Sequence, residues 1–253
     1  MQSRQRQQDA GVLILDKERF SARAAAYSKF RPTYPTEAID FVLEGLAIPV
    51  RAADLGAGTG ISSRMLAERD VAVIAVEPND AMRAEAPQHP LVVWAKGSAE
   101  DTGLAAQSVD LVTAFQAFHW FDASHAFAEM QRVSRRRAAL VQYERDESSD
   151  FTRAYGDTVR LYATDATEAR RLQALSEFRS FPGARVLEEH CASSQALNMD
   201  ELLGRAASAS YLPQTGGAGH ALRARLRDLF GEYQRDGCVE LQMTIFVLTA
   251  DFN

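Results

Sequence analysis

The stretch that decides the fold is Asp54-Leu55-Gly56-Ala57-Gly58-Thr59-Gly60, which joins a short apolar run to a helical pattern. Glycines in such a turn permit positive φ angles and let a ligand approach the backbone closely. The helix that follows directs unpaired backbone amides toward the same place. Glu77 ends the next apolar run, where a carboxylate can accept hydrogen bonds from both ribose hydroxyls of a nucleoside. The stretch therefore predicts a nucleoside-binding site on a strand, loop and helix.

Two ligand classes fit this arrangement, NAD and S-adenosylmethionine, and the glycine spacing distinguishes between them. A dinucleotide site requires Gly-x-Gly-x-x-Gly. Here the last position is Ile61 when counted from Gly56, and Ser63 when counted from Gly58. Asp54, just before the glycines, also suits a ligand with an ammonium group better than a pyrophosphate. The spacing favours S-adenosylmethionine, and a nicotinamide-dependent oxidoreductase is the alternative from another enzyme class.

Around this stretch, short apolar runs alternate with helical patterns, as in parallel α/β sheets. Strands are expected at Arg51–Leu55, Val71–Val76, Leu91–Ala95, Val109–Phe115, Ala138–Tyr143, Ala184–Cys191 and Cys238–Thr249. Helices are expected at Ile61–Arg69, Asn79–Ala86, Asp122–Val133, 150–163, 166–178, Met199–Ala207 and Ala218–Asp236. The predicted fold class is α/β: a Rossmann-like, seven-stranded, mostly parallel sheet with helices on both faces. An N-terminal lid and a helical insertion after the fifth strand complete it.

Composition and charge limit the classes of molecule that the protein is expected to bind. The 253 residues are 46% hydrophobic, which is ample for a core without metals or disulfides. A net charge of −6 disfavours a nucleic-acid surface, and the basic run Arg135-Arg136-Arg137 is interpreted as a solvated helix end or loop. Cys191 and Cys238 form no paired motif, so no zinc site or disulfide is expected and a cytoplasmic location is predicted. No apolar run is long enough for a membrane span.

Four segments resemble the successive motifs of class I S-adenosylmethionine-dependent methyltransferases: Asp54–Gly60, Glu77-Pro78, Gly97–Glu100 and Val109–Trp120. They are similar in particular to the type 11 small-molecule group, which includes trans-aconitate methyltransferase. Phe20–Pro35 resembles the N-terminal lid of those enzymes. The specific motifs cover residues 20–145, and because no segment of the chain resembles a linker between domains, one methyltransferase domain is expected over 1–253. Its expected parts are a leader and lid (1–47), a cofactor-binding core (48–145), a helical insertion or cap (146–182), and C-terminal strands and helices that complete the sheet (183–253).

The resemblance also implies a cofactor, S-adenosylmethionine, with S-adenosylhomocysteine as product. Glu77 would hold the ribose, and Arg31 would pair with the cofactor carboxylate. Ser98 stands where the family commonly has Asp, which leaves a hydrogen-bonding group without the charge. The full set of cofactor-binding residues expected in this way is Tyr27, Arg31, Asp54, Gly56, Ala57, Gly58, Glu77, Pro78, Asn79, Met82, Ser98, Ala99, Glu100, Gln116 and Ala117.

The predicted reaction is methyl transfer to a small molecule, most readily to an oxygen of a carboxylate or hydroxyl, by in-line displacement. A carboxylate acceptor needs no base, whereas a hydroxyl does, and His119 after the fourth strand is interpreted as either a general base or a pocket wall. Gln116 is a second catalytic candidate. The residues expected to bind the acceptor are His119, Trp120 and Tyr34.

Other readings of the same residues stay open. One is a protein of this fold that binds the cofactor without methyl transfer, or that catalyses another reaction. Phe115-Gln116-Ala117-Phe118 lacks the Asn/Asp-Pro-Pro-Tyr motif that grips a flipped-out base, so no nucleic acid is expected as partner. No catalytic metal and no membrane partner are expected either. The protein is expected to be a monomer or a homodimer.

Overall fold

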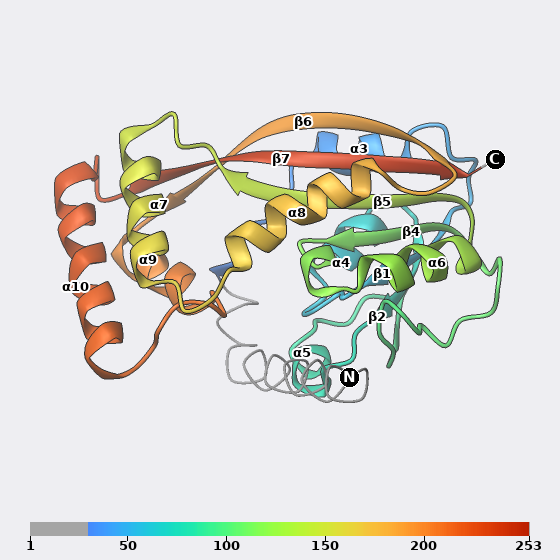
Figure 1. The fold of residues 1–253 in the computed structure, drawn as a ribbon, viewed down its shortest axis with the longest axis horizontal. Coiled ribbons are helices and arrows are strands. Elements are labelled where there is room, and N and C mark those ends of the chain that lie inside the picture. The colour runs from blue at the N-terminus through green and yellow to red at the C-terminus, as the bar shows by residue number, and fades with distance from the viewer. Residues whose placement is uncertain (1–29, 253) are drawn as a thin grey trace, which may run out of the picture.

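A seven-stranded sheet forms the centre of the computed structural model, which describes residues 30–252 (Figure 1). Its strand order is β3-β2-β1-β4-β5-β7-β6. β7 pairs antiparallel with both β5 and β6, and the other neighbours pair in parallel. This confirms the predicted Rossmann-like, mostly parallel sheet. The strands are β1 Arg51–Leu55, β2 Ala72–Val76, β3 Val92–Ala95, β4 Val109–Phe115, β5 Ser134–Arg145, β6 Ala184–Leu197 and β7 Val239–Phe252.

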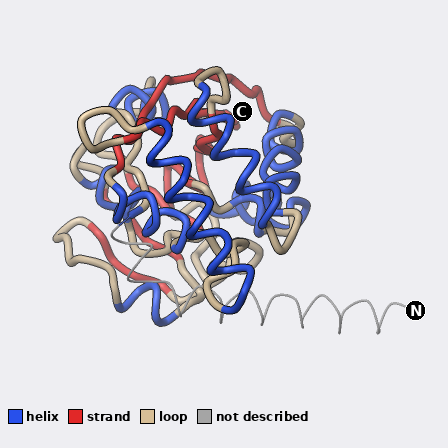
Figure 2. The backbone as a smooth tube through the Cα atoms, turned by 90° about the vertical axis from the view of Figure 1, so that its left-hand side faces the viewer, coloured by secondary structure: helices blue, strands red, loops and turns tan. Residues whose placement is uncertain are grey.

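Helices lie on both sides of the strands (Figure 2), because successive strand side chains point to opposite faces. Ala52 and Leu111 face one apolar cluster, while their chain neighbours Ala53 and Val112 face another. The helices are α3 Thr36–Leu43, α4 Ile61–Ala67, α5 Asp80–Ala84, α6 Ala123–Val133, α7 Asp150–Tyr162, α8 Thr167–Arg179, α9 Met199–Ala207 and α10 Gly216–Tyr233, with a 3₁₀ turn η1 at Phe118–Trp120.

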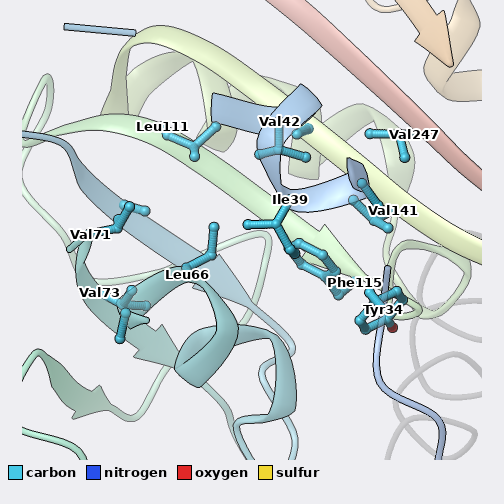
Figure 3. Close-up of a cluster of buried hydrophobic side chains, with 14 of the residues drawn as sticks. Tyr34, Ile39, Val42, Leu66, Val71, Val73, Leu111, Phe115, Val141 and Val247 are labelled. Atoms are coloured by element: carbon cyan, nitrogen blue, oxygen red, sulfur yellow. The ribbon is translucent and has the colours of Figure 1, made fainter. Parts of the chain in front are cut away.

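The first apolar cluster joins α3 and α4 to the sheet. Ile39 and Val42 of α3 and Leu66 of α4 pack against Leu111 and Val141 of the strands (Figure 3). Burial of such a side chain stabilises the fold by about 1.5–3 kcal/mol. Residues 36–43, which the sequence analysis assigns to the leader and lid, thus form part of the core layer.

The second cluster covers the opposite face of the sheet. Met130 of α6 and Phe178 of α8 are fully buried in it, and Phe178 packs edge-on against Phe118 with ring centroids 5.6 Å apart. The third cluster lies apart from both and joins α7, α9 and α10. Figure 1 shows these three helices gathered beyond the arrowhead of β5. We call α7, α9 and α10 together the cap.

The cap differs from the insertion expected at 146–182. Of the two helices in that segment, α7 joins the cap, whereas α8 covers the sheet through Ala174, Leu175 and Phe178. The cap is completed by α9 and α10, which flank the far ends of β6 and β7. These two strands pair continuously from Ala184↔Phe252 to Leu197↔Val239. The expected strand Ala184–Cys191 is therefore too short, because the ladder with β7 continues beyond it and carries the cap.

The basic run at residues 135–137 lies in β5 and is neither a helix end nor a loop. Arg137 is buried, 7% exposed, and its guanidinium pairs with Asp251 of β7. It also donates to the carbonyl oxygens of Val42 and Glu44 at 3.0 and 2.8 Å. These carbonyls end α3 and lack partners within the helix. Arg137 thus ties α3 to the sheet through segments far apart in sequence, which a local charge pattern does not reveal.

Candidate functional site

A cavity of about 190 Å³ opens where β1, β2, β3 and β4 end. Ligands of open α/β sheets bind at this edge, beyond the carboxyl ends of the strands. The cavity is lined from the sheet side by the segments that follow these strands and from the other side by residues near α8 and α9. Its lining residues are Arg31, Gly56, Gly58, Glu77, Pro78, Asn79, Met82, Ser98, Ala99, Glu100, Gln116, Ala117, His119, Trp120, Phe121, Thr167, Arg171, Ser210 and Tyr211.

The glycine loop after β1 requires its glycines. Gly56, Gly58 and Gly60 have φ angles of +64°, +58° and +75°, in the left-handed region that other residues rarely adopt. A Cβ on Gly56 would lie 2.7 Å from the Cβ of Ala117, so the loops after β1 and β4 touch only because that atom is missing. The amide of Gly56 donates to the carbonyl of Val76 at 2.9 Å. The loop is thereby fixed to the ends of both neighbouring strands.

Asp54 supports this loop from beneath and does not line the cavity. It is fully buried, and its carboxylate accepts hydrogen bonds from the hydroxyls of Ser62, Ser63 and Thr113 at 2.7, 2.6 and 2.8 Å. Burial raises the pKa of Asp54, and the three hydroxyl groups oppose that effect. The expectation that Asp54 contacts the cofactor is therefore corrected. It joins β1 to β4 and to the start of α4, since its short side chain points into the core.

Glu77 lies where the ribose was expected. It is 8% exposed, lines the cavity, and accepts backbone hydrogen bonds from Gly58 at 2.9 Å and Asn79 at 2.8 Å, one on each oxygen. Each oxygen of a carboxylate has a further acceptor position, so the group can also receive two hydroxyl donors. Asn79 caps α5 by accepting from the amides of Ala81 and Met82. Glu77 is thus held in one orientation before any ligand binds.

The expected adenine end is present in the same cavity. Pro78, Met82 and Ala99 give it apolar walls, and Met82 and Ala99 are buried. Ser98 accepts a hydrogen bond from the amide of Asp101 through its hydroxyl, at 3.2 Å. The carboxylate of Glu100 accepts from the amide of Asp122 at 2.9 Å and so joins this turn to the start of α6.

Gln116 forms the wall where β4 ends. Its φ of +50° is strained for a residue other than glycine. Its side-chain amide donates to the carbonyl of Tyr143 at 3.3 Å and accepts from the amide of Tyr143 at 2.9 Å. Both ends of the side chain are therefore engaged with β5. This geometry fits a positioning residue for the loop better than a group that handles protons.

His119 lines the cavity from η1. Its Nδ1 is buried and has no hydrogen-bond partner within residues 30–252. Burial lowers the pKa of His119 well below its usual value of 6.5, and the positive charges of Arg171, Arg170 and Arg31 lower it further. The imidazole is neutral at pH 7 and is a weak base. Of the two interpretations, the structure favours the pocket wall, with the ring 4.9 Å from that of Trp120.

Besides Asp54, two expected residues that the structure describes lie outside this cavity. Tyr27 falls in residues 1–29, which the structure does not describe. Tyr34 and Ala57 line a separate cavity of about 20 Å³, where Tyr34 packs edge-on against Phe115 with ring centroids 5.0 Å apart. Tyr34 is thus a core residue in this structure, because its ring packs in the first apolar cluster. Arg31 lines both cavities and donates to the hydroxyl of Tyr143 at 2.5 Å.

Sequence reasoning missed five lining residues: Phe121, Thr167, Arg171, Ser210 and Tyr211. Phe121 directly follows Trp120, and its position after the fourth strand could have identified it as a lining residue in the same way. The other four come from α8 and the segment after α9, where no motif marks them. Arg171 is buried and forms a two-pronged ion pair with Glu144, at 2.8 and 3.0 Å. Nothing in the local sequence shows that this arginine faces a ligand cavity.

Among residues 30–252, no group of three His, Cys, Asp or Glu side chains is arranged to hold a metal ion. None of the helices there is both long and apolar enough to cross a membrane.

Comparison with known proteins agrees with this geometry. Residues 53–141 match a family described as a methyltransferase domain. An uncharacterized methyltransferase of Mycobacterium tuberculosis is 41% identical over 146 residues, which are 55% of this chain and 58% of that protein. The match thus spans little more than half the length of this relative.

Solved structures cover more of the chain. That of a proposed type II methyltransferase from Anaeromyxobacter dehalogenans is 29% identical with a TM-score of 0.65, and the match covers 88% of this chain and 98% of that one. A phosphoethanolamine N-methyltransferase of Haemonchus contortus, solved with S-adenosylhomocysteine, is 15% identical with a TM-score of 0.50. That match covers 92% of this chain and 57% of the other.

The fold, the glycine loop and the relatives together support a class I S-adenosylmethionine-dependent methyltransferase domain. The residues present fit that cofactor: the glycine loop admits a close ligand, Glu77 offers two oriented carboxylate oxygens, and an apolar end follows beyond them. The narrower likeness to the group of trans-aconitate methyltransferase stays a prediction.

Proposed function

We propose that this protein methylates an oxygen atom of a small-molecule acceptor, with S-adenosylmethionine as the donor. The observation that carries the proposal is the position of Glu77, fixed by two backbone amides at the wall of a cavity that also contains the glycine loop. When bound, S-adenosylmethionine supplies an activated methyl group on a positively charged sulfur. The protein residues bind it, align the acceptor and exclude water.

The residues divide into two groups by place. On the sheet side, Glu77 would accept hydrogen bonds from the ribose hydroxyls, and Gly56 and Gly58 would allow close approach of the methionine part. Pro78, Met82 and Ala99 would contact the adenine. His119, Trp120 and Phe121, which follow β4, and Tyr211, which follows α9, wall the space left for an acceptor.

The state of His119 bears on the accepting atom. A neutral imidazole with a strongly lowered pKa removes a proton poorly, so it gives little help to a hydroxyl or an ammonium group. An acceptor oxygen that is already ionised, such as a carboxylate or an acidic hydroxyl, needs no base. This supports methylation of oxygen over nitrogen.

The size and walls of the cavity bear on the acceptor class. At about 190 Å³ it is bounded by the cap on one side, and apolar rings form much of the acceptor end. The net charge of −6 gives no support to a nucleic-acid partner. A small organic molecule is the partner that this arrangement supports.

Calorimetric titration with S-adenosylhomocysteine tests the cofactor site. We expect micromolar binding, no binding of NAD, and at least about tenfold weaker binding by Glu77→Ala, because a hydrogen bond to a charged group contributes about 1.5–3 kcal/mol. Glu68→Ala is the matched control, since Glu68 is an exposed carboxylate at the end of α4. Equal binding by Glu77→Ala and the wild type would refute the site assignment.

Turnover separates an enzyme from a cofactor-binding protein. Purified protein with labelled S-adenosylmethionine and a panel of carboxylic acids and phenols should transfer label to at least one acid or phenol and to none of the matched amines. Tight cofactor binding without transfer to any acceptor would favour the non-catalytic alternative.

A further inference from the structure

A second cavity, of about 30 Å³, adjoins the first on the cap side. Arg31, Arg171 and Tyr211 line both cavities, so the two cavities lie next to each other. The smaller one is also lined by Tyr143, Tyr155 and Arg205, and it includes neither Glu77 nor any residue of the glycine loop. We call it the arginine subsite.

Arg205 carries a buried positive charge in this subsite. It lies on α9 and is only 8% exposed. Its guanidinium carbon is 5.1 Å from the centroid of the Tyr143 ring, and Nη2 is 3.8 Å from the sulfur of Met243. Nη1 is buried, and none of the described residues, 30–252, supplies a hydrogen-bond partner for it. Across residues 30–252, no carboxylate forms an ion pair with Arg205.

The other arginines nearby differ in this respect. Arg145 pairs with Glu147 at 3.3 Å and with Glu168 at 2.6 Å. Arg171 pairs with Glu144. A buried charge without a partner is destabilising, by several kcal/mol in general. Arg31 donates to the hydroxyl of Tyr143 and to the carbonyl of Ser208. Arg205, for which residues 30–252 supply no carboxylate partner, is therefore a charge in the subsite that a bound anion would neutralise.

The volume limits what that anion is. One water molecule needs about 10–15 Å³ by the same measure, so about 30 Å³ holds two atoms of that size. This matches the two oxygens of a carboxylate and is small for the oxygens of a phosphate group. The tyrosine hydroxyls around the space add donors that a carboxylate can use.

We infer that the acceptor carries a carboxylate that binds in the arginine subsite, against Arg205 and Tyr143, while the rest of the molecule extends into the larger cavity. This inference rests on the proposed function and names its substrate class. Because Arg205 neutralises that carboxylate, it anchors the acceptor, and the methylated oxygen is a different one, in the larger cavity beside His119 and Trp120.

The first test uses protein saturated with S-adenosylhomocysteine and two matched probe pairs, benzoate with benzamide and hexanoate with hexanamide. Calorimetry should show each carboxylate binding at least about tenfold more tightly than its amide, since a charge-assisted hydrogen bond is about twice as strong as a neutral one. In Arg205→Met the two members of each pair should bind equally, at the weaker level. S-adenosylhomocysteine should bind this variant within about twofold of the wild type.

The control is Arg225→Met, which removes an exposed arginine of the neighbouring helix α10. It should retain the preference for carboxylates. If Arg205→Met does not fold, the wild-type comparison of acid with amide still decides the matter. Equal binding of acid and amide by the wild type overturns the inference.

Tyr143 offers an independent readout. Burial acts to raise its pKa, but the charges of Arg31 and Arg205 outweigh that effect and lower the pKa of Tyr143 to about 8. A carboxylate bound at Arg205 should raise this pKa again, so the ultraviolet absorbance of tyrosinate at pH 9 should fall when benzoate is added. Tyr143→Phe should abolish the change. The charged and titratable groups that the described part of the chain places around Tyr143 are Arg31, Tyr34, Arg145, Tyr155, Arg171, Arg205 and Tyr211.

The outcomes separate the two proposals. Binding of S-adenosylhomocysteine without a preference for carboxylates, and without a change in tyrosinate absorbance, overturns the inference and leaves the proposed function intact. A carboxylate preference that depends on Arg205 in a protein that does not bind S-adenosylhomocysteine overturns the proposed function and supports the subsite.

Discussion

The two sides of the cavity are built in different ways. On the sheet side, recognition depends on backbone shape and one carboxylate, all within short segments after β1, β2 and β3. On the cap side it depends on long side chains from β5, α8 and α9, which meet only in the folded protein. The difference indicates that the cofactor half is a local property of the chain, whereas the acceptor half is a property of its packing. Specificity for the acceptor can therefore change without change to the cofactor motif.

The largest effect is expected from Gly56→Val on the sheet side. Its φ of +64° and the 2.7 Å approach to Ala117 exclude a side chain, so strain of at least about 3 kcal/mol should weaken S-adenosylhomocysteine binding by more than about a hundredfold. Gly217→Val is the control, because no atom lies within 4 Å of its added Cβ. Calorimetry checks both. Near-normal binding by Gly56→Val would mean that the loop does not confine the ligand.

An intermediate effect is expected away from the cavity, at Arg137, which ties α3 and β7 to β5. Arg137→Met removes the pair with Asp251 and leaves two carbonyls at the end of α3 without donors, so unfolding in urea should require about 2 kcal/mol less free energy. Arg135→Met should change stability by less than about 0.5 kcal/mol, because its pair with Asp110 is largely exposed. Equal losses in the two variants would contradict the assigned role of Arg137.

The smallest effect is expected at His119, which lines the cavity from η1. Because burial and nearby arginines hold the pKa of His119 well below its usual value of 6.5, its titration should leave no inflection in kcat near pH 6.5. His119→Gln should lower kcat by less than about tenfold, because the loss is one of shape and not of a base, which contributes about 10²–10⁴-fold. A pH–rate profile with an inflection near 6.5 that the variant loses would restore the general base.

Much of the fold follows from local pattern. The strands at Arg51–Leu55 and Val109–Phe115 and the helix at Met199–Ala207 begin and end where the sequence analysis places them. Errors concentrate in β5, β6 and β7, each longer than expected. The part of β6 that the sequence analysis misses contains Ser193, Ser194 and Gln195, which form no apolar strand pattern, yet pairing with β7 holds these residues in the sheet.

The candidate site also has a part that local sequence predicts and a part that it does not. Fourteen of the residues expected there by sequence line the main cavity, from Arg31 and Gly56 to Trp120. Asp54 was placed at the right end of the right strand, but its short side chain turns into the core. The position of a residue in a strand decides to which face of the sheet its side chain points. For Asp54, the hydroxyl donors on that face come from α4 and β4, which the local sequence does not reveal.

The sequence by itself determined the class of protein, because a glycine loop, an acidic residue at the end of the next strand and the alternation of strands and helices are local requirements of one binding site. Only the tertiary structure decided which side chains meet around the acceptor. Arg171, Arg205 and Tyr211 are separated from the motif along the chain and carry no pattern of their own. Long-range pairing of β5, β6 and β7 brings them to the cavity, and it also leaves the charge of Arg205 buried.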